Sequence, residues 1–123
     1  MSGIDDKRDE VFTVERPWGA FQSFTTNTQV TVKVITVQPG SRLSLQTHEH
    51  RAEMWQVLDD APMDITVDDR QWQAVKGELI WVPQGAVHRM GNSGTTPARI
   101  LEVGYGHFDE DDIVRIEDDY QRS

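Results

Sequence analysis

The chain has 123 residues, no cysteine and a formal net charge of −9 at pH 7. This length suits a single domain with one hydrophobic core, and the missing cysteine excludes disulfides, thiolate catalysis and cysteine-based zinc sites. The acidic balance argues against nucleic acid and against anionic lipid as partners, because both attract basic surfaces. The first ten residues hold no apolar run, and no apolar stretch is long enough to cross a membrane, so we expect a cytoplasmic protein.

The middle of the chain has the pattern of short strands separated by turns. After a polar segment at residues 1–10, which we expect to be a flexible N-terminus, β-branched and alternating stretches are divided by glycine, proline or aspartate. The expected strands span residues 30–37, 42–50, 53–58, 63–67, 71–75, 79–82, 88–90 and 98–103. Many short strands at regular spacing predict an all-β sandwich or barrel, which we place at residues 11–108.

The C-terminal segment, residues 109–123, combines many acidic side chains with a few apolar ones. The apolar residues are Ile113, Val114, Ile116 and Tyr120. A fully solvated tail would not need them. We therefore expect a short helix or an acidic strap that lies over the barrel.

Imidazole, amide and carboxylate side chains gather in and beside three of the expected strands. Residues two apart on a strand share a face, so Gln46, His48 and His50 should point the same way. Glu53 opens the next expected strand, and His88 comes from a third. Imidazole nitrogens with carboxylate or amide oxygens are typical ligands of a first-row divalent ion. These residues therefore predict a metal site around His48, Glu53 and His88, with Gln46 or His50 as a further ligand.

Two spaced motifs resemble those of the cupin superfamily. The first has glutamine in place of the usual first histidine, and the second matches at every fixed position. Their residues are Gly40, Gln46, His48 and Glu53, and then Gly77, Pro83, Gly85, His88 and Asn92. The resemblance implies an all-β, single-domain double-stranded β-helix, a jelly-roll barrel, that holds one divalent metal ion. It implies zinc in the first place, with manganese, iron or nickel as alternatives, bound by Gln46, His48, Glu53 and His88.

The chain is similar to one cupin group in particular, the type II mannose-6-phosphate isomerases. The stretches that carry the likeness are residues 16–19, 39–55, 83–89 and 110–120. The resemblance implies an enzyme that interconverts mannose 6-phosphate and fructose 6-phosphate through an enediolate, with this phosphosugar as its small-molecule partner.

Four places depart from the pattern of that family. Glu49 and Met54 replace histidines, Asp59 and Asp60 stand where a turn glycine is usual, and Gln121 replaces another glycine. These departures keep two other hypotheses open. One is a non-catalytic, metal-holding module that binds a sugar or phosphosugar, and the other is a cupin oxygenase.

A phosphosugar brings about two negative charges, which need cations inside an acidic protein. The candidates for substrate binding are Arg42, Arg51, Arg89 and Arg99. The candidates for catalytic groups are Lys33, His50 and Arg115. Arg115 would cap the site if the strap closes the barrel mouth. For the base that carries the proton, the sequence leaves Glu53, His50 and Lys33 open.

An apolar outer surface predicts a homodimer. Leu43 and Leu45 would share this surface with the exposed-face valines of residues 30–37. Association of two copies through the same patch would remove that apolar surface from water.

Overall fold

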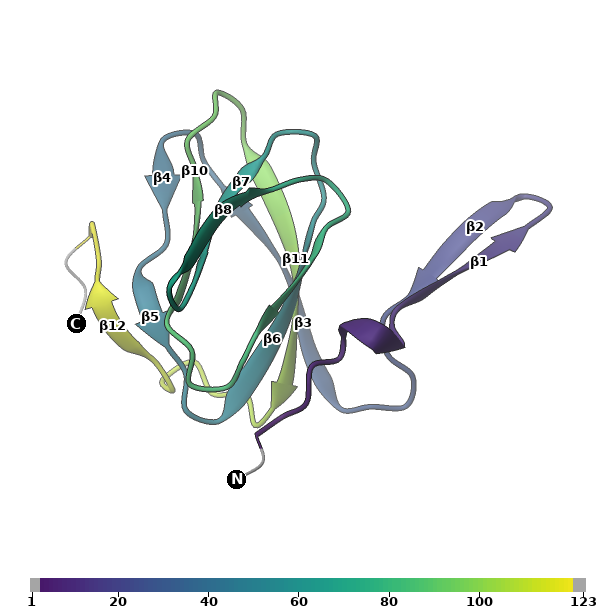
Figure 1. Ribbon diagram of the computed structural model, residues 1–123, viewed down its shortest axis with the longest axis horizontal. Coiled ribbons are helices and arrows are strands. Elements are labelled where there is room, and N and C mark those ends of the chain that lie inside the picture. The colour runs from purple at the N-terminus through teal and green to yellow at the C-terminus, as the bar shows by residue number, and fades with distance from the viewer. Residues whose placement is uncertain (1–2, 121–123) are drawn as a thin grey trace.

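The structure, a computed structural model, describes residues 3–120 and is built almost wholly from β-strands (Figure 1). Its elements in chain order are the short 3-10 helix η1 (Arg8–Glu10) and the strands β1 (Phe12–Arg16), β2 (Gly19–Ser23), β3 (Val30–Val37), β4 (Ser41–Arg42), β5 (Leu45–Thr47), β6 (Arg51–Val57), β7 (Met63–Val67), β8 (Arg70–Ala74), β9 (Leu79–Val82), β10 (His88–Asn92), β11 (Ala98–Gly106) and β12 (Val114–Glu117). The alternating pattern of the sequence thus produces an all-β architecture. Within residues 3–120, no helix has the length and apolar character needed to span a membrane.

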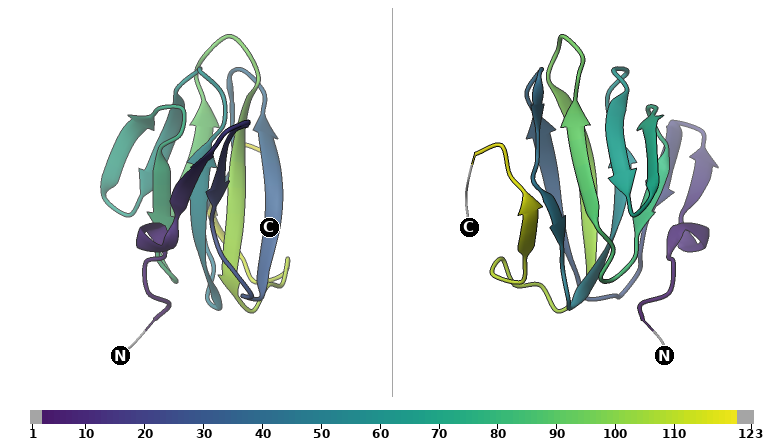
Figure 2. Two further views of the ribbon diagram at one scale, coloured as in Figure 1. Left: turned by 90° about the vertical axis from the view of Figure 1, so that its right-hand side faces the viewer. Right: turned by 60° about the vertical axis from the view of Figure 1, so that its left-hand side comes forward.

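Two antiparallel sheets face each other across the main core (Figures 1 and 2). The four-stranded sheet has the order β3-β11-β6-β9, and the six-stranded sheet has the order β12-β5-β10-β7-β8, with β4 paired to β10. Trp55 and Ile100 from the first sheet pack in one cluster with Ile65 and Met90 from the second. Among the described residues the two sheets are separate hydrogen-bonded units. The wall is therefore a jelly roll of two facing sheets and not a continuously bonded cylinder.

Strand β6 is covered on both faces, which explains why all seven of its residues are buried. Trp55 and Val57 belong to the main core. On the other face of β6, Ala52 and Met54 belong to a second cluster, which they form with Trp81, Val103 and Tyr105. Ile4 and Val11 pack against this second cluster. The described part of the expected flexible N-terminus, residues 3–10, therefore contacts the domain; residues 1 and 2 lie outside the described part.

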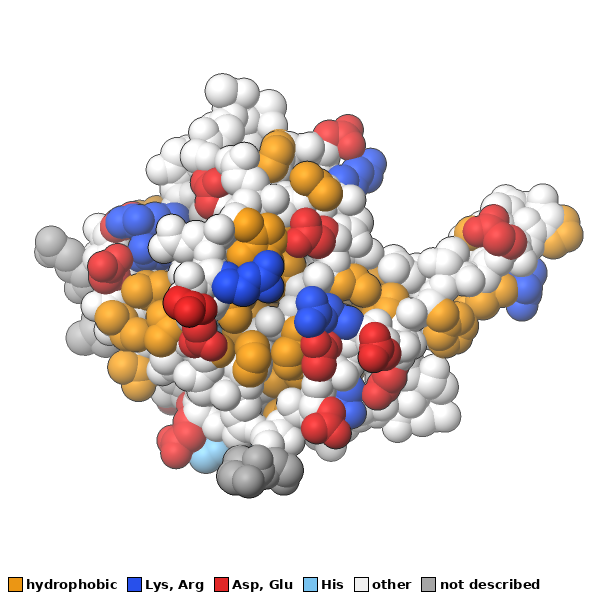
Figure 3. Space-filling model, viewed as in Figure 1, with side chains coloured by type: hydrophobic (Ala, Val, Ile, Leu, Met, Phe, Trp, Pro, Cys, Tyr) orange, Lys and Arg blue, Asp and Glu red, His pale blue; other side chains and the backbone are white. Residues whose placement is uncertain are grey.

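Strands β1 and β2 form a hairpin that projects from the two sheets (Figures 1 and 2). It is a two-stranded sheet of its own, within the range 11–108 that we expected to form the barrel. Phe12, Trp18 and Phe21 are exposed on or beside its strands, and Figure 3 shows hydrophobic side chains along the projection. The hairpin thus presents apolar surface outside the core.

The C-terminal segment is an extended strap that joins the six-stranded sheet. After a turn at Glu110 and Asp111, β12 pairs antiparallel with β5, with Val114 opposite Thr47 and Arg115 opposite Gln46. The strap therefore lies beside the strand that carries the first motif, and of the two forms we expected it is the extended one. Residues 121–123, which complete the expected strap, lie outside the described part.

The single strand expected at residues 42–50 is wrong, because the structure divides this stretch. Strand β4 ends at Arg42, β5 covers Leu45–Thr47, and a bend follows at residues 49 and 50. Leu43 packs against the main core, and Leu45 is half-buried beside β12. Leu43 therefore does not belong to the outer apolar surface expected for a dimer, and Leu45 contributes to that surface only in part. Val32 and Val34 of β3 do remain exposed, at 55% and 54%.

Candidate metal centre

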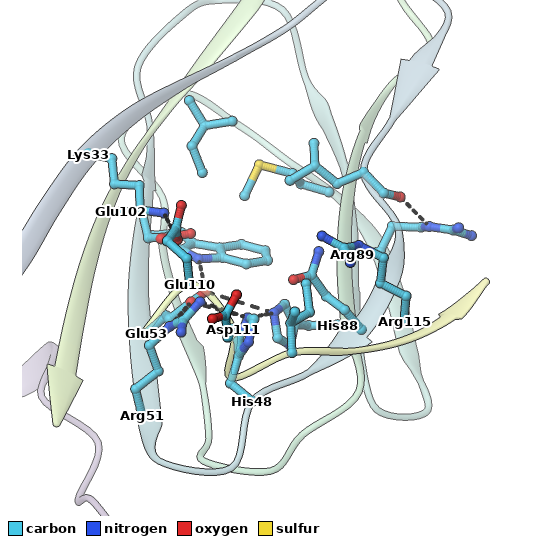
Figure 4. Close-up of a pocket in the computed structure, with 16 residues that line it drawn as sticks. Lys33, His48, Arg51, Glu53, His88, Arg89, Glu102, Glu110, Asp111 and Arg115 are labelled. Atoms are coloured by element: carbon cyan, nitrogen blue, oxygen red, sulfur yellow. Dashed lines mark hydrogen bonds and ion pairs between the residues drawn. The ribbon is translucent and has the colours of Figure 1, made fainter. Parts of the chain in front are cut away.

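Three side chains of the kind that bind metal ions converge between the sheets (Figure 4). His48 follows β5, Glu53 lies in β6 and His88 begins β10, so both sheets contribute. One ligand atom from each residue lies within 4.8 Å of the others, and all three side chains are buried. The structure thus brings together the three residues around which the sequence predicted a metal site.

The second motif docks directly on the first. Gly85 adopts a φ of 83°, a left-handed conformation that favours glycine. Its N–H donates to the carbonyl oxygen of His48 at 3.0 Å. In the neighbouring pair of strands, His88 of β10 lies opposite Gln46 of β5. Because of these contacts, the turn before β10 and the end of β5 form one unit that carries both histidines.

Hydrogen bonds to the backbone determine which nitrogen of each imidazole carries the proton. Nδ1 of His48 lies 2.7 Å from the carbonyl oxygen of Asp112, and Nδ1 of His88 lies 3.0 Å from that of Ala86. A carbonyl oxygen can only accept, so both Nδ1 atoms are the donors and both Nε2 atoms carry a lone pair. The two Nε2 atoms are 3.1 Å apart. Two lone pairs at this distance repel each other unless a cation shares them, so the pair fits a divalent metal ion.

The charges around the cluster also suit a metal. Burial lowers the pKa of His48 and of His88 below the ordinary 6.5, so both imidazoles are neutral at pH 7. The Glu53 carboxylate lies 3.5 Å from Nε2 of His48 and 3.8 Å from Nε2 of His88. Burial alone would raise the pKa of Glu53, but the charge that the two imidazoles carry when protonated in acid, together with the charge of Arg51, holds it below its usual range. Two neutral nitrogens and one carboxylate are a common set of zinc ligands.

Two neighbours on β6 hold the Glu53 carboxylate in place. Arg51 Nε donates to Oε2 at 2.9 Å, and Trp55 Nε1 donates to Oε1 at 3.0 Å. Arg51 Nη2 also lies 3.2 Å from Nε2 of His48. Arg51, which the sequence predicted to bind substrate, therefore contacts Glu53 and His48, two of the three candidate metal ligands.

The structure separates the two candidates for a further ligand. Gln46 lines the cavity together with His48 and His88. Its amide nitrogen donates to the carbonyl and hydroxyl oxygens of Ser44, at 3.3 and 3.1 Å, which leaves the amide oxygen for a metal. His50 follows the bend after β5, and its side chain is 58% exposed beside Glu49. The expectation that His50 faces inward with His48 is therefore wrong, because the strand ends at Thr47.

The ligand cluster opens into a cavity of about 330 Å³, a size typical of small-molecule sites. Four of the predicted cations line it: Lys33, Arg51, Arg89 and Arg115. Arg42 and Arg99 do not. Arg42 is exposed and binds Asp119 at 2.8 Å, and Arg99 is exposed and binds Asp59 at 2.9 Å.

Glu102 is a residue of the cavity that the sequence analysis missed. It lies in β11, opposite Lys33 of β3 on one side and Trp55 of β6 on the other, and it is buried. Burial and the nearby Glu53 carboxylate raise the pKa of Glu102 to about 8. A signal was present in the sequence, since Glu102 is two positions from Ile100 and so shares its inward face.

Comparison with known proteins identifies the family. The sequence matches, over residues 5–118, the model of the family described as Mannose-6-phosphate isomerase C-terminal. The chain belongs to this family. It is 43% identical over 111 residues to the alginate biosynthesis protein AlgA of Pseudomonas aeruginosa, which covers 89% of this chain and 23% of that protein. It is 41% identical over 110 residues to mannose-1-phosphate guanylyltransferase of Escherichia coli, and the match covers 89% of this chain and 23% of that protein. The chain thus spans about a quarter of the length of these curated relatives.

Solved structures identify the fold. An uncharacterized conserved protein with a double-stranded β-helix domain from Klebsiella pneumoniae has a TM-score of 0.62 at 22% identity, over 75% of this chain and 77% of that chain. A sugar phosphate isomerase from a cupin superfamily from Silicibacter pomeroyi has a TM-score of 0.57 at 21% identity, over 73% of this chain and 68% of that chain. At these identities the likeness concerns the fold alone, and it confirms the expected cupin fold.

Proposed function

We propose that this chain is a metal-dependent isomerase that interconverts mannose 6-phosphate and fructose 6-phosphate through a cis-enediolate. The observation that carries the proposal is the cluster of His48, Glu53 and His88 in a cavity lined by cations. Membership of the Mannose-6-phosphate isomerase C-terminal family supports the choice of reaction.

His48, Glu53 and His88 would hold the metal ion, with the amide oxygen of Gln46 as the fourth ligand. Zinc suits nitrogen and oxygen donors and is our first choice, with manganese, iron and nickel as alternatives. When bound, the ion supplies Lewis-acid stabilisation of the negative charge that develops on a substrate oxygen. Trp55 and Arg51 keep the carboxylate of Glu53 oriented toward the imidazoles through the hydrogen bonds described above.

Lys33 and Glu102 are our candidates for carrying the proton. The conversion of the aldose removes a proton from C2 and returns one to C1, while the hydroxyl proton on O2 is lost and O1 gains one. Both side chains line the cavity, and they are direct neighbours across β3 and β11. His50 is outside the cavity, and Glu53 is assigned to the metal. A positioned group within hydrogen-bond reach of the substrate is what general acid–base catalysis requires.

Arg89 and Arg115 are our candidates for binding the phosphate. In Figure 4 they lie across the cavity from Lys33 and Glu102, so a sugar phosphate could place its two ends on opposite walls. Arg89 Nε donates to the carbonyl oxygen of Leu43 at 2.9 Å, and Nη1 donates to Oε1 of Glu117 at 3.1 Å, so the phosphate would compete with Glu117 for this guanidinium group. Arginine is well suited to this task because its planar group binds phosphate oxygens in pairs.

Three of the four departures from the family pattern lie away from the cavity lining, and the fourth, Gln121, lies outside the described residues. Met54 is 1% exposed and belongs to the second cluster, on the opposite face of β6 from Glu53. The side chains of Glu49 and Asp60 are 81% and 93% exposed. Because these positions do not line the cavity, they do not argue against the isomerase.

A coupled assay for fructose 6-phosphate formed from mannose 6-phosphate tests this proposal. The metal-free protein should gain activity when zinc, manganese, iron or nickel is added, and His88→Ala should abolish it. Arg99→Ala, which removes an exposed cation outside the cavity, serves as the matched control. No turnover with any of these metals, together with thermal stabilisation by mannose 6-phosphate, would favour the binding module. Oxygen uptake with a diketone or thiol substrate would favour an oxygenase.

A further inference from the structure

The bend after β5 is held by one side chain of the C-terminal strap. The N–H of Glu49 donates to Oδ1 of Asp112, and the N–H of His50 donates to Oδ2, both at 2.8 Å. The two carboxylate oxygens thus bind two successive backbone amides. These hydrogen bonds hold the pKa of Asp112 below its usual range, although its partial burial opposes this. The bend depends on a residue more than sixty positions away.

The backbone of the same residue orients His48. The carbonyl oxygen of Asp112 accepts the Nδ1 proton of His48 at 2.7 Å, across 64 residues of sequence. His88 differs, because its Nδ1 donates to Ala86, only two residues away. One histidine of the cluster is therefore oriented by its own turn and the other by the strap.

Further contacts tie the same part of the strap to the cavity. Arg51 Nη1 donates to the carbonyl oxygen of Asp109 at 3.2 Å, and Lys33 binds Glu110 at 3.2 Å. Just before the strap, Phe108 lies under both cations, 4.5 Å from Lys33 Nζ and 4.3 Å from the guanidinium carbon of Arg51. A change in how the strap docks would therefore reach the cluster through several groups at once.

We propose that Asp112 is a positioning residue for His48 and that docking of the strap and binding of the metal are thermodynamically linked. This inference rests on the proposed metal site. The carboxylate of Asp112 holds the bend. The backbone carbonyl of Asp112 keeps the proton of His48 on Nδ1, which leaves Nε2 of His48 free to bind the metal. Groups that orient ligands in this way typically change metal affinity by roughly 10–100-fold when they are removed. The linkage is reciprocal, so the metal must also stabilise the docked strap.

The first test needs no metal. In metal-free protein at pH 8, long-range ¹H–¹⁵N spectra of the imidazoles should show the proton of His48 on Nδ1. Asp112→Ala keeps the backbone carbonyl but removes the carboxylate that holds the bend against the strap, so the preference of His48 should weaken, while His88, held by Ala86, keeps its own and shows that the domain is folded. Asp112→Asn retains one acceptor oxygen and should give an intermediate result. Asp119→Asn is the matched control, because it removes a carboxylate of the same strap that binds Arg42 outside the cavity.

The second test measures the zinc dissociation constant by competition with a chromophoric chelator. It should rise roughly 10–100-fold in Asp112→Ala and stay within about twofold in Asp119→Asn. Zinc should also slow amide hydrogen exchange at Glu49 and His50 in the wild type and much less in Asp112→Ala. An unchanged His48 tautomer and an unchanged zinc affinity in Asp112→Ala would overturn the role of Asp112 but would leave the metal site standing. A wild-type protein that keeps the His48 tautomer but binds no zinc would overturn the metal site and the linkage together.

Discussion

Glu102 lies directly opposite Lys33 in the register of β11 and β3, and both side chains line the cavity beside the ligand cluster. Burial, with the nearby Glu53 carboxylate, raises the pKa of Glu102 to about 8. The ordinary pKa of glutamate is 4.5, so between these values the folded protein keeps a proton that the unfolded chain releases. A measurable consequence is an unusual dependence of stability on pH.

In the metal-free protein, the contribution of Glu102 to stability should be complete below pH 4.5 and should be lost as the pH rises through about 8. The slope is at most about 1.4 kcal/mol per pH unit for one proton. Glu102→Gln keeps the shape and cannot ionise, so urea unfolding in the presence of a chelator should show this slope removed between pH 5 and pH 8. The same slope in wild type and variant would show that Glu102 is not the group responsible.

Restoring histidine, the usual family residue, at position 54 should not raise the proposed isomerase activity. Met54 is buried in the second cluster, away from the cavity, so Met54→His places a polar ring among apolar side chains. We expect a loss of about 1–3 kcal/mol in the free energy of unfolding and no rise in kcat. A kcat increase without loss of stability would mean that position 54 does reach the substrate.

Arg89 should contribute to substrate affinity and Arg99 should not. A charge-assisted hydrogen bond contributes about 1.5–3 kcal/mol, so Arg89→Ala should raise KM for mannose 6-phosphate by roughly tenfold or more. If the phosphate is held equally in ground and transition states, kcat should change little. Arg99→Ala should leave both parameters unchanged, because Arg99 is exposed, binds Asp59 and does not line the cavity. Equal effects of the two substitutions would argue against Arg89 as the phosphate ligand.

The homodimer remains a proposal, and its surface is now narrower than the sequence suggested. Val32 and Val34 are exposed neighbours on β3, and β3 is an edge strand of its sheet. Val32→Asp should shift the molecular mass measured by light scattering toward that of a monomer. The control is Val75→Asp, at a valine of similar exposure, 56%, located after β8. Dissociation by both substitutions, or by neither, would rule out this surface.

The parts of the fold that the sequence predicted are those with local causes. Alternation between two faces is a property of each strand, and so β3, β6, β7 and β9 lie close to their expected ranges. The motif glycines and histidines also have fixed local spacing, and the structure brings His48, Glu53 and His88 to one point.

What the sequence did not predict depends on contacts between distant segments. The sequence places His50 on the inward face because nothing local ends the strand at Thr47, whereas in the structure a bend follows and Asp112 accepts a hydrogen bond from the amide of His50. Glu102 faces the cavity because of its register with two other strands. Asp112 itself could not be singled out among the acids of the tail, since its role follows from where the strap docks.

The anomalous difference density of a crystal grown with zinc would show whether His48, Glu53 and His88 bind one metal ion. We expect one peak in the cavity, bonded at about 2.0–2.2 Å to Nε2 of His48, Nε2 of His88 and the carboxylate of Glu53, with the amide oxygen of Gln46 beside it. Zinc found only on exposed carboxylates, with the two imidazoles turned away from each other, would contradict this expectation.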